Sequence, residues 1–366
     1  MTEFKRTPLY NQHLTAGAKM AEFASWEMPL YYGSQIEEHQ IVRTDAGMFD
    51  VSHMNVVDFI GTGARNYLHY LIANNVDKLK EQGKALYSCM LNDKGGVVDD
   101  LIVYKFNDQD YRMVINAATR EKDLAWITQN KVGFDVEIKP HPEFAMIAIQ
   151  GPNAITKTQS VLTPKQREAS KNLKIFQGIE VDGWWIARTG YTGEDGYEIM
   201  LPAEAAPNFW QALLGAKITP CGLVPRDSLR LEAGMCLYGS EMDENITPLE
   251  TSLEWTIGWE PTTRKFIGRE VLEKQKREGV KRNLYGLIIG KGEGILRSHQ
   301  KVITPSGTGE ITSGGFSPTL GHSVALARLP SKVKINDRVF VEIRGKNISA
   351  RVIKPNFVRN GKKVFE

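Results

Sequence analysis

Apolar and polar positions along the chain follow two spacings, and each spacing predicts a different kind of element. Alternation of apolar and polar residues predicts strands and two hairpins, which turn at Gly95-Gly96 and at Gly193-Glu-Asp-Gly196. The predicted strands lie in the second half of residues 47–60 and in residues 111–115, 136–138, 144–149 and 184–201. Helical spacing marks residues 64–71, 121–129, 209–214 and 227–234. This β-α-β-β-α-β order favours an α+β fold over a doubly wound parallel sheet.

The last part of the chain has a different pattern, with short apolar runs separated by Gly, Ser and Pro. These runs cover residues 284–289, 301–303, 309–312, 324–329 and 339–343. They predict an all-β terminal domain, either a barrel or a sandwich. A segment rich in Lys and Arg, residues 274–282, precedes them and is predicted to be a linker. A length of 366 residues predicts two or three domains in all.

Composition narrows the class of protein. The chain is 42% hydrophobic and 24% charged, no apolar stretch approaches a membrane span, and its start lacks the apolar run of a signal peptide. Three scattered cysteines without metal-ligand spacing predict small buried side chains in a reducing cytoplasm. A net charge of +3 without a basic stripe argues against a nucleic-acid partner. No dinucleotide fingerprint, phosphate-binding loop or zinc motif is present, which argues against nucleotide cofactors and metal.

Two adjacent acids, Asp99 and Asp100, begin the apolar run that continues to Tyr104. In a strand, successive side chains point to opposite faces, so the two carboxylates lie on different sides. If both faces of this strand are covered, at least one carboxylate is buried and requires a cation, hydrogen-bond donors or a ligand. The alternative is an exposed hairpin end with two solvated acids.

Three further residues sit where local rules disfavour them. Arg226 follows Pro225 in the first turn of a predicted helix, where the helix dipole disfavours a cation. It either binds a carboxylate of a ligand or pairs with Asp227 or Glu232. Glu198 lies in an apolar strand, as an edge residue facing water or as a buried acceptor. Tyr191 either stacks on a flat ligand or packs in the core.

Nearby polar residues have plainer interpretations. Glu194 and Asp195 lie in a turn bracketed by glycines and are predicted to be solvated. His53, in a polar run beside an apolar strand, is predicted to be a structural histidine with its hydrogen bonds satisfied.

A series of motifs resembles the T-protein family of the glycine cleavage system, whose members are aminomethyltransferases. The motifs span essentially the whole chain in order. They are Thr7-Pro-Leu-Tyr10, Asp50-Val-Ser-His-Met54, the run from Tyr87 to Asp100, Gly190-Tyr-Thr-Gly-Glu-Asp-Gly-Tyr-Glu198, Arg226-Asp-Ser-Leu-Arg-Leu-Glu-Ala-Gly234, Thr247-Pro248, Thr312-Ser-Gly314, Ser317-Pro-Thr-Leu320 and the end from Lys354 to Arg359.

The resemblance implies a three-domain, cloverleaf-like folate-binding fold that ends in a β-barrel domain. The implied domains are residues 1–50 with 140–245, residues 51–139 with 246–280, and residues 283–366. It also implies a reaction in which an aminomethyl group on the lipoyl arm of the H-protein passes to tetrahydrofolate. The expected products are 5,10-methylenetetrahydrofolate, ammonia and the dihydrolipoyl H-protein. Functional association with glycine decarboxylase and dihydrolipoyl dehydrogenase in glycine catabolism is expected too.

Site residues follow from the resemblance position by position. Asp100 matches the acid at the reactive edge of the folate, where it would stabilise an iminium-like cation or accept a ring proton. Glu198 matches the acceptor for the amino-pyrimidine donors of the pterin, and Arg226 matches an arginine of the folate site. The positions expected to line the folate cavity are Met54, Tyr87, Asn116 and Tyr191.

The chain departs from the family pattern at two places. Lys265 precedes Phe266-Ile-Gly268 where an acid is common, and Ile295-Leu-Arg297 replaces the more frequent Ile-Pro-Arg. Two other functions stay open: a folate-binding protein of iron–sulfur cluster assembly, and the folate domain of a demethylating flavoenzyme. Absence of a cysteine between Cys89 and Cys221 argues against the first, and absence of a dinucleotide fingerprint argues against the second.

Overall fold

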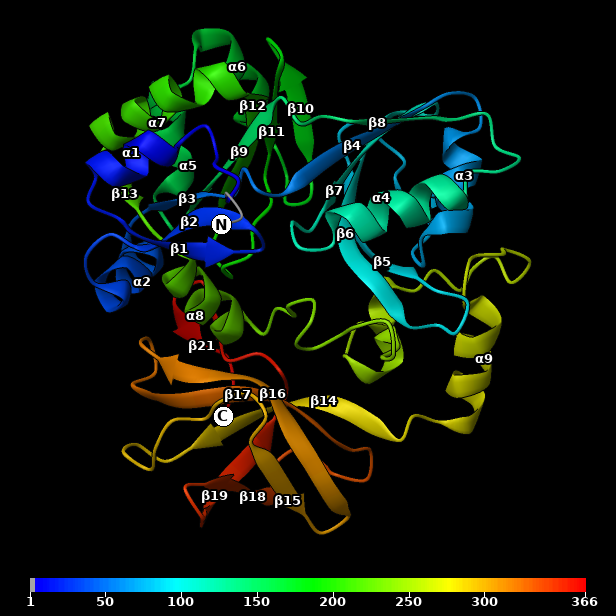
Figure 1. Ribbon diagram of the computed structural model, residues 1–366, viewed down its shortest axis with the longest axis vertical. Coiled ribbons are helices and arrows are strands. Elements are labelled where there is room, and N and C mark those ends of the chain that lie inside the picture. The colour runs from blue at the N-terminus through cyan, green and yellow to red at the C-terminus, as the bar shows by residue number, and fades with distance from the viewer. Residues whose placement is uncertain (1–3) are drawn as a thin grey trace. The chain divides into compact units, whose positions relative to one another are not determined.

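The computed structural model describes residues 4–366, and the chain divides into two compact units (Figure 1). The first unit consists of Met1–Leu68, Val76–Tyr87 and Leu101–Asp227. The second consists of His69–Asn75, Ser88–Asp100 and Ser228–Glu366. The division falls within two α-helices and two strands of the chain and directly before a short 3-10 helix.

The described chain contains α-helices, short 3-10 helices and strands, whose bounds are as follows. The α-helices are α1 (Tyr10–Thr15), α2 (Gln35–Thr44), α3 (Ala64–Leu71), α4 (Arg120–Gln129), α5 (Ala154–Val161), α6 (Pro164–Ser170), α7 (Ala206–Gly215), α8 (Leu223–Ala233) and α9 (Arg269–Glu278). The 3-10 helices are η1 (Val76–Lys78), η2 (Ala203–Ala205), η3 (Pro248–Glu250) and η4 (Glu254–Thr256). The strands up to α8 are β1 (Lys19–Phe23), β2 (Trp26–Tyr31), β3 (Gly47–Asp50), β4 (Asn55–Ile60), β5 (Ala85–Leu91), β6 (Val97–Asn107), β7 (Asp110–Ile115), β8 (Glu137–Pro140), β9 (Phe144–Gln150), β10 (Gly178–Val181), β11 (Trp184–Ala187), β12 (Gly196–Pro202) and β13 (Thr219–Pro220). The strands after α8 are β14 (Arg282–Ile289), β15 (Lys301–Thr304), β16 (Gly307–Ser317), β17 (His322–Pro330), β18 (Arg338–Ile343), β19 (Lys346–Ile353), β20 (Val358–Arg359) and β21 (Lys362–Lys363).

A six-stranded sheet in the first unit has the order β10-β11-β12-β9-β3-β13. The strands from β10 to β3 run antiparallel to their neighbours, and β13 joins β3 in parallel. Six of the seven residues of β9 are buried, because this strand lies inside the sheet and both of its faces are covered. The predicted α+β class is therefore confirmed.

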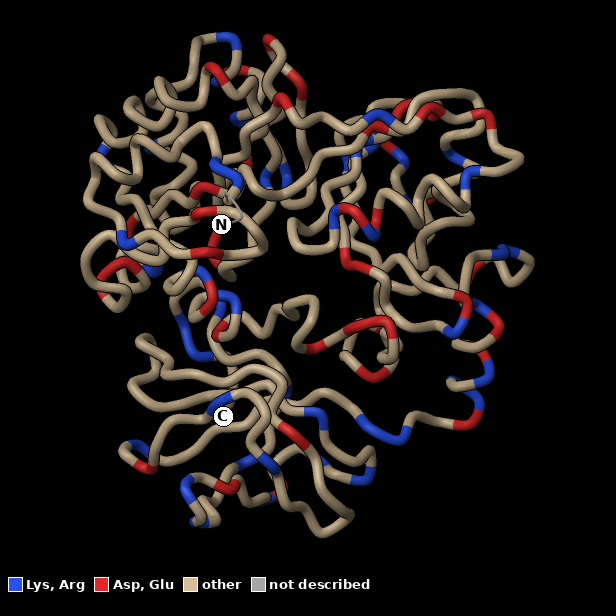
Figure 2. Tube along the Cα trace, in the orientation of Figure 1, with Lys and Arg blue, Asp and Glu red and all other residues tan. Residues whose placement is uncertain are grey.

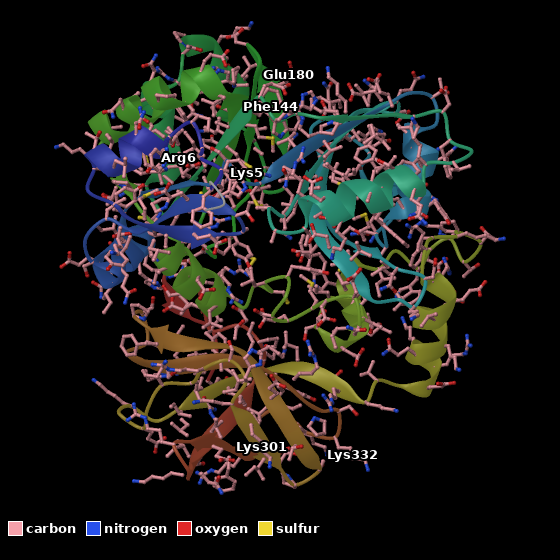
Figure 3. All side chains as sticks on the ribbon, viewed as in Figure 1. Lys5, Arg6, Phe144, Glu180, Lys301 and Lys332 are labelled. Atoms are coloured by element: carbon pink, nitrogen blue, oxygen red, sulfur yellow. The ribbon has the colours of Figure 1, made fainter. Side chains whose placement is uncertain are left out.

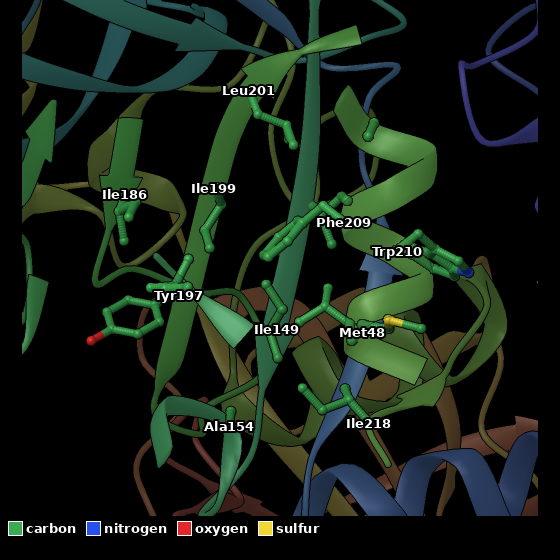
Figure 4. Packing of buried hydrophobic residues seen from close by; sticks show 14 of the residues in the cluster. Met48, Ile149, Ala154, Ile186, Tyr197, Ile199, Leu201, Phe209, Trp210 and Ile218 are labelled. Carbon is green, nitrogen blue, oxygen red and sulfur yellow. The ribbon is translucent and has the colours of Figure 1, made fainter. Parts of the chain in front are cut away.

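Helix α7 covers the core of this sheet. Figure 4 shows Phe209 of α7 facing the strands that carry Ile149 and Ile199. Trp210 of the same helix is fully buried, and its ring meets the edge of His13 at 5.4 Å between centroids. Burial of each such side chain contributes about 1.5–3 kcal/mol, so this cluster holds the sheet firmly as a platform.

A five-stranded sheet, of order β5-β6-β7-β4-β8, packs its aromatic residues against the first sheet. Within the first unit, Tyr104 and Phe106 of β6 contact the indole of Trp185 in β11, with ring centroids 5.2 Å and 4.6 Å apart. Arg112 of β7 lies 5.1 Å from the ring centroid of Phe144, which is labelled in Figure 3. This packing brings the hydroxyl end of Tyr104 to the segment that follows β11.

The second unit contains the predicted all-β domain, which is a barrel. Six antiparallel strands close in the order β14-β17-β16-β15-β18-β19. Their inward residues, among them Leu287, Val302 and Ala327, are fully buried and form one apolar cluster. Closure removes the unpaired edges of an open sheet, and Lys301 and Lys332 in Figure 3 belong to this domain.

The predicted linker is wrong in its first half, because residues up to Glu278 belong to helix α9. Its sequence, Arg-Glu-Val-Leu-Glu-Lys-Gln-Lys-Arg-Glu, consists almost entirely of strong helix formers, and Leu272 is fully buried. Figure 2 shows the basic residues of this helix and of the chain that follows it. The predicted boundaries of three domains remain a prediction. Among residues 4–366, no helix combines the length and apolar character that crossing a membrane requires.

Candidate active site

Glu198 is a buried carboxylate in the middle of β12, only 6% exposed. Its two cross-strand neighbours are alanines, Ala148 of β9 and Ala187 of β11, whose small side chains leave room beside the carboxylate. The hydroxyl of Thr189 donates a hydrogen bond of 2.6 Å to Glu198 Oε2. Of the two alternatives left by the sequence, the buried acceptor is therefore correct.

Two arginines hold the segment between β11 and β12, residues 188–195: Arg43 connects it to α2, and Arg188 closes it internally. Arg43 of α2 donates to the Thr192 carbonyl oxygen at 2.6 Å and to Glu194 Oε1 at 2.7 Å. Arg188 pairs with Asp195 through Nε at 2.9 Å and Nη2 at 2.5 Å. The prediction that Glu194 is solvated is wrong, because its side chain is buried beside Arg43, whereas Asp195 is partly exposed as it pairs with Arg188.

Gln150 at the end of β9 holds the same segment from the other side. Its Nε2 donates to the Thr189 carbonyl oxygen at 3.0 Å, and its Oε1 accepts from the Thr192 hydroxyl at 2.9 Å. A Cβ atom at Gly190 would lie 1.9 Å from Gln150 Oε1. Glycine is required there for close approach, and the segment that carries Tyr191 is consequently held in one position.

Arg226 lies on α8, which begins at Leu223, two residues before the proline that was predicted to start it. Its guanidinium carbon lies 5.0 Å from the ring centroid of Tyr191 and 5.7 Å from that of Phe49. Both distances are within the range of cation–π attraction. Burial lowers the pKa of Arg226, and the charge of Glu198 opposes that change.

The guanidinium is only partly satisfied. Arg226 Nη1 is buried and has no hydrogen-bond partner among residues 4–366. The predicted alternative of an ion pair with Asp227 or Glu232 is wrong. Within its own unit, Arg226 has no carboxylate at ion-pair distance. Glu232 belongs to the second unit, where it accepts hydrogen bonds from Ser317 and Thr319. A cation stacked on an aromatic ring with a bare N–H is suited to an acceptor on a ligand.

His53 is buried, but its hydrogen bonds are not satisfied as predicted. Its Nδ1 has no partner among the described residues 4–366, and its ring meets Phe23 edge-on at 5.6 Å. Burial lowers the pKa of His53 to about 4, with a further contribution from the charge of Arg226. The imidazole is therefore neutral at physiological pH and adds no charge beside Arg226.

Neighbouring Asp50 belongs to a separate hydrogen-bond network. It accepts from the Thr7 hydroxyl at 2.6 Å and the Ser52 amide at 2.9 Å, and lies 2.8 Å from His13 Nε2. Burial raises the pKa of Asp50, but its bonds with His13, Ser52 and Thr7 outweigh burial and hold the pKa below its usual value. This carboxylate is fully used within the fold and is unsuited to ligand binding.

The remaining predicted cavity residues of the first unit lie on other elements. Met54 and Asn116 flank the same end of the β4–β7 pair, in which Asn55 is opposite Ile115. The side chain of Asn55 donates to the Asn116 carbonyl oxygen at 3.0 Å. Tyr87 is half-buried in β5. The structure thus brings Tyr191, Glu198 and Arg226 together, and Met54 and Asn116 together.

Asp99 and Asp100 belong to the second unit, at the start of β6. Asp99 is fully buried and Asp100 is half-buried, so two solvated acids are excluded. Residues 243–246 fix this end of the strand, because the Val97 amide donates to the Asp243 and Ile246 carbonyl oxygens at 3.0 Å. In a strand, adjacent carboxylates point to opposite faces, and Asp100 is the one of the two that is partly exposed.

Two cysteines lie within electrostatic reach of Asp100 in the second unit. Burial raises the pKa of Cys89, and the charge of Asp100 raises it further. Burial, Glu241 and then Asp100 raise the pKa of Cys236 in the same way. Both thiols therefore stay protonated and unreactive. All three cysteines are buried and free of disulfides, as predicted. Residues 4–366 contain no group of three or more His, Cys, Asp or Glu that could hold a metal ion.

Sequence patterns missed the residues that hold the site in place, above all Tyr104, Thr189 and Arg43. Thr189 stands directly before the Gly190-Tyr191 motif, so its position offered a signal. Arg43 offered none, since its partner Glu194 is 151 residues away. The assembled group in the first unit combines a flat ring, a cation with an unused N–H and an oriented carboxylate. Such a group binds a flat polar molecule that has both donors and acceptors.

Comparison with known proteins gives consistent matches over the whole chain. Residues 9–261 match the family described as the GCVT N-terminal domain, and residues 282–359 match the glycine cleavage T-protein C-terminal barrel domain. An aminomethyltransferase of Chromobacterium violaceum is 56% identical over 367 residues, which is 100% of both chains. One of Legionella pneumophila is 53% identical over 360 residues, covering 98% of this chain and 99% of the relative. The crystal structure of glycine cleavage system aminomethyltransferase T from Bartonella henselae is similar with a TM-score of 0.91 at 34% identity, covering 98% of this chain and 99% of that one.

Proposed function

The chain belongs to the glycine cleavage T-protein family and is an aminomethyltransferase, and on that premise we propose the reaction, partner and residues that follow. The substrate is an aminomethyl group carried as a thioaminal on the lipoyl arm of a glycine cleavage H-protein. The acceptor is tetrahydrofolate. The products are 5,10-methylenetetrahydrofolate, ammonia and the dihydrolipoyl H-protein.

The observation that carries this proposal is the group formed by Tyr191, Glu198 and Arg226. The amino-pyrimidine edge of a pterin offers adjacent N–H donors, and a buried carboxylate is their natural acceptor. Glu198 supplies that acceptor at 6% exposure, with Thr189 bound to one oxygen. The Tyr191 ring offers a flat surface, and the unused N–H of Arg226 offers a donor for folate oxygens. Met54, Tyr87 and Asn116 are proposed to line the cavity.

Asp100 is proposed as the catalytic acid residue. Departure of ammonia from the thioaminal leaves a sulfur-stabilised methylene cation, and departure of the thiol leaves an iminium-like cation; a fixed carboxylate stabilises either one strongly where water is scarce. The folate ring nitrogen loses a proton as it forms the new C–N bond, and in this proposal the same carboxylate accepts it. Half-burial of Asp100 supports this assignment, because fully buried Asp99 offers a substrate no access.

No resident cofactor enters the proposed reaction: tetrahydrofolate is a co-substrate, and neither a metal nor a nucleotide takes part. The lipoylated H-protein is the direct partner, and the decarboxylase and dihydrolipoyl dehydrogenase of the same system supply and reoxidise its lipoyl arm. The proposed location is the cytoplasm, without nucleic-acid or membrane partners.

Reconstitution tests the proposal directly. The chain is mixed with tetrahydrofolate and aminomethylated H-protein, and ammonia and 5,10-methylenetetrahydrofolate are measured over time. We expect both products in equal amounts. A control lacking folate should release ammonia much more slowly. Ammonia without methylenetetrahydrofolate, or no dependence on folate at all, would contradict the proposal.

A further inference from the structure

Three polar side chains of the first unit form a linear hydrogen-bonded chain that ends on Glu198. The Tyr104 hydroxyl oxygen lies 3.2 Å from Thr189 Oγ1, and Thr189 Oγ1 donates to Glu198 Oε2 at 2.6 Å. Tyr104 is fully buried, and Thr189 and Glu198 are each 6% exposed. The chain joins β6 of one sheet to β12 of the other through the segment after β11.

The direction of each hydrogen bond follows from the proton count. Burial and the charge of Glu198 raise the pKa of Tyr104 far above its usual value, so the phenol keeps its proton. A carboxylate only accepts, and a threonine hydroxyl has one proton to donate. Thr189 therefore donates to Glu198 and accepts from Tyr104. Each bond orients and polarises the next.

The Thr189 hydroxyl occupies one acceptor position of Glu198 Oε2 and leaves acceptor capacity on both carboxylate oxygens for two donors of a ligand. Oε2 is bound by Thr189, whereas Oε1 has no hydrogen-bond partner among residues 4–366. Thr189 itself cannot move easily, because its carbonyl oxygen accepts from Gln150 Nε2 at 3.0 Å. The carboxylate is thus held in one rotation before any ligand arrives, and a ligand need not provide the free energy to order it.

We propose that Thr189, supported by Tyr104, is a positioning residue that sets the specificity of the site for ligands with two adjacent N–H donors, such as an amino-pyrimidine ring. This inference rests on the proposed folate-dependent function and extends it. A site built around an oriented acceptor rejects an analogue that lacks one donor, because the carboxylate is then left unpaired in a buried place.

The test compares T189V, T189S and Y104F with the wild-type enzyme. Steady-state transfer from aminomethylated H-protein gives KM for tetrahydrofolate and kcat, and direct titration gives Kd. T189V should raise KM and Kd about tenfold or more, with a much smaller change in kcat, because a hydrogen bond to a charged group orients the ligand. T189S should restore KM to within about threefold, and Y104F should raise it by less than T189V.

A specificity measurement separates positioning from general destabilisation. The wild-type enzyme should bind tetrahydrofolate more tightly than a folate analogue that lacks the 2-amino group, as measured by inhibition. This preference should be smaller in T189V. T158V is the matched control, because Thr158 on α5 is equally buried but its hydroxyl has no partner among residues 4–366. This control should leave KM, Kd and discrimination unchanged.

Several outcomes would overturn the inference. They are an unchanged KM in T189V, an equal loss in T189S and T189V, and undiminished discrimination against the analogue. If T189V fails to fold, T189S and Y104F still test the inference. Unchanged KM and Kd in Y104F would show that Tyr104 does not support Thr189. Failure of the proposed function looks different, since the wild type itself would then show no folate-dependent transfer.

Discussion

Two arginines, one in each unit, differ in how completely their guanidinium groups are hydrogen-bonded. In the second unit, Arg264 is 3% exposed, and its three nitrogens donate to five backbone carbonyl oxygens, those of His69, Ile72, Ala73, Asn74 and Gly258. In the first unit, Arg226 stacks on Tyr191 and leaves a buried Nη1 without a partner among residues 4–366.

The difference separates a structural clamp from a binding group. Arg264 neutralises the carbonyl end of α3, where a cation is favoured by the helix dipole, and all of its bonds are internal. Arg226 loses solvation without complete compensation, which costs stability. A fold can retain such a cost where a ligand later pairs the group, so Arg226, rather than the better bonded Arg264, is the proposed ligand-binding residue.

The largest expected effect is on stability, in R264M. This change removes the donors of several buried carbonyl groups at once, and we expect the free energy of unfolding to fall by about 3–5 kcal/mol. Thermal or urea unfolding followed by circular dichroism measures it. R226M is the matched control and should unfold at nearly the wild-type temperature. Equal destabilisation by both changes would break the distinction between clamp and binding group.

The next largest effect is expected at Asp99 and Asp100, which in one strand also contrast a structural residue with one proposed to act on the substrate. D100N should keep the fold and lower kcat about 10²–10³-fold, because the neutral amide no longer stabilises a developing cation. D99N should lower kcat far less and act mainly on stability, because Asp99 is fully buried. Rates of methylenetetrahydrofolate formation, with melting temperatures for both variants, give the answer. Equal losses of kcat would remove the assignment of Asp100.

R226M itself should lower kcat/KM for tetrahydrofolate about 10–100-fold, since a charge-assisted hydrogen bond and a stacked cation are lost together. R226K tests the geometry of the planar fork. It keeps the charge but should recover only part of the activity. Full recovery in R226K would mean that charge alone matters, and an unchanged kcat/KM in R226M would place the folate elsewhere.

A smaller effect is expected in ligand-induced stabilisation. Tetrahydrofolate at about 100 times its Kd should stabilise the wild type by about 2.7 kcal/mol, which appears as a rise in melting temperature. E198A should reduce that rise, because the acceptor for the pterin donors is missing. Differential scanning fluorimetry with and without folate measures both proteins. An unmoved wild-type melting curve would contradict folate binding, and an undiminished rise in E198A would contradict the role of Glu198.

The smallest effect is the change that R226M makes to the pKa of His53, which at about 4 lies below the usual 6.5. Because the unfolded chain binds this proton more readily, the free energy of unfolding should rise with pH between about 4 and 6.5 and lose this dependence above 6.5. R226M removes one charge that lowers this pKa, so the His53 pKa should rise by less than about one unit. NMR titration, with H53Q to assign the signal, measures it. A fall in R226M would show that Arg226 does not act on His53.

Much of the fold was predictable because its signals are local. The helical spacing of residues 64–71 matches α3, and the apolar run at 144–149 matches β9 apart from its last residue. The predicted linker included part of α9 because dense charge is common to linkers and to exposed helices. The hairpin of β1 and β2 was not predicted, since no residue of β1 is fully buried and no buried apolar face marks it.

The site was predictable only where a residue breaks a local rule. Glu198 in an apolar strand and Arg226 in a first helical turn both stood out. The residues that support them did not stand out, because Arg43 and Glu194 become neighbours only in the fold, as do Tyr104 and Thr189. Alternation separated Asp99 from Asp100, but no local rule indicated which of them is buried, because tertiary packing decides it.

Gly190 has a consequence for how sequence variation in this protein should be interpreted. In a loop, and half-buried, it resembles a position that tolerates exchange, yet even alanine would press its methyl group against the amide of Gln150. The strain would pass to Thr189 and from there to the rotation of Glu198. A substitution at Gly190 should thus alter folate selectivity in addition to its local cost in packing. Screens that score variants by protein level alone would not separate these two effects.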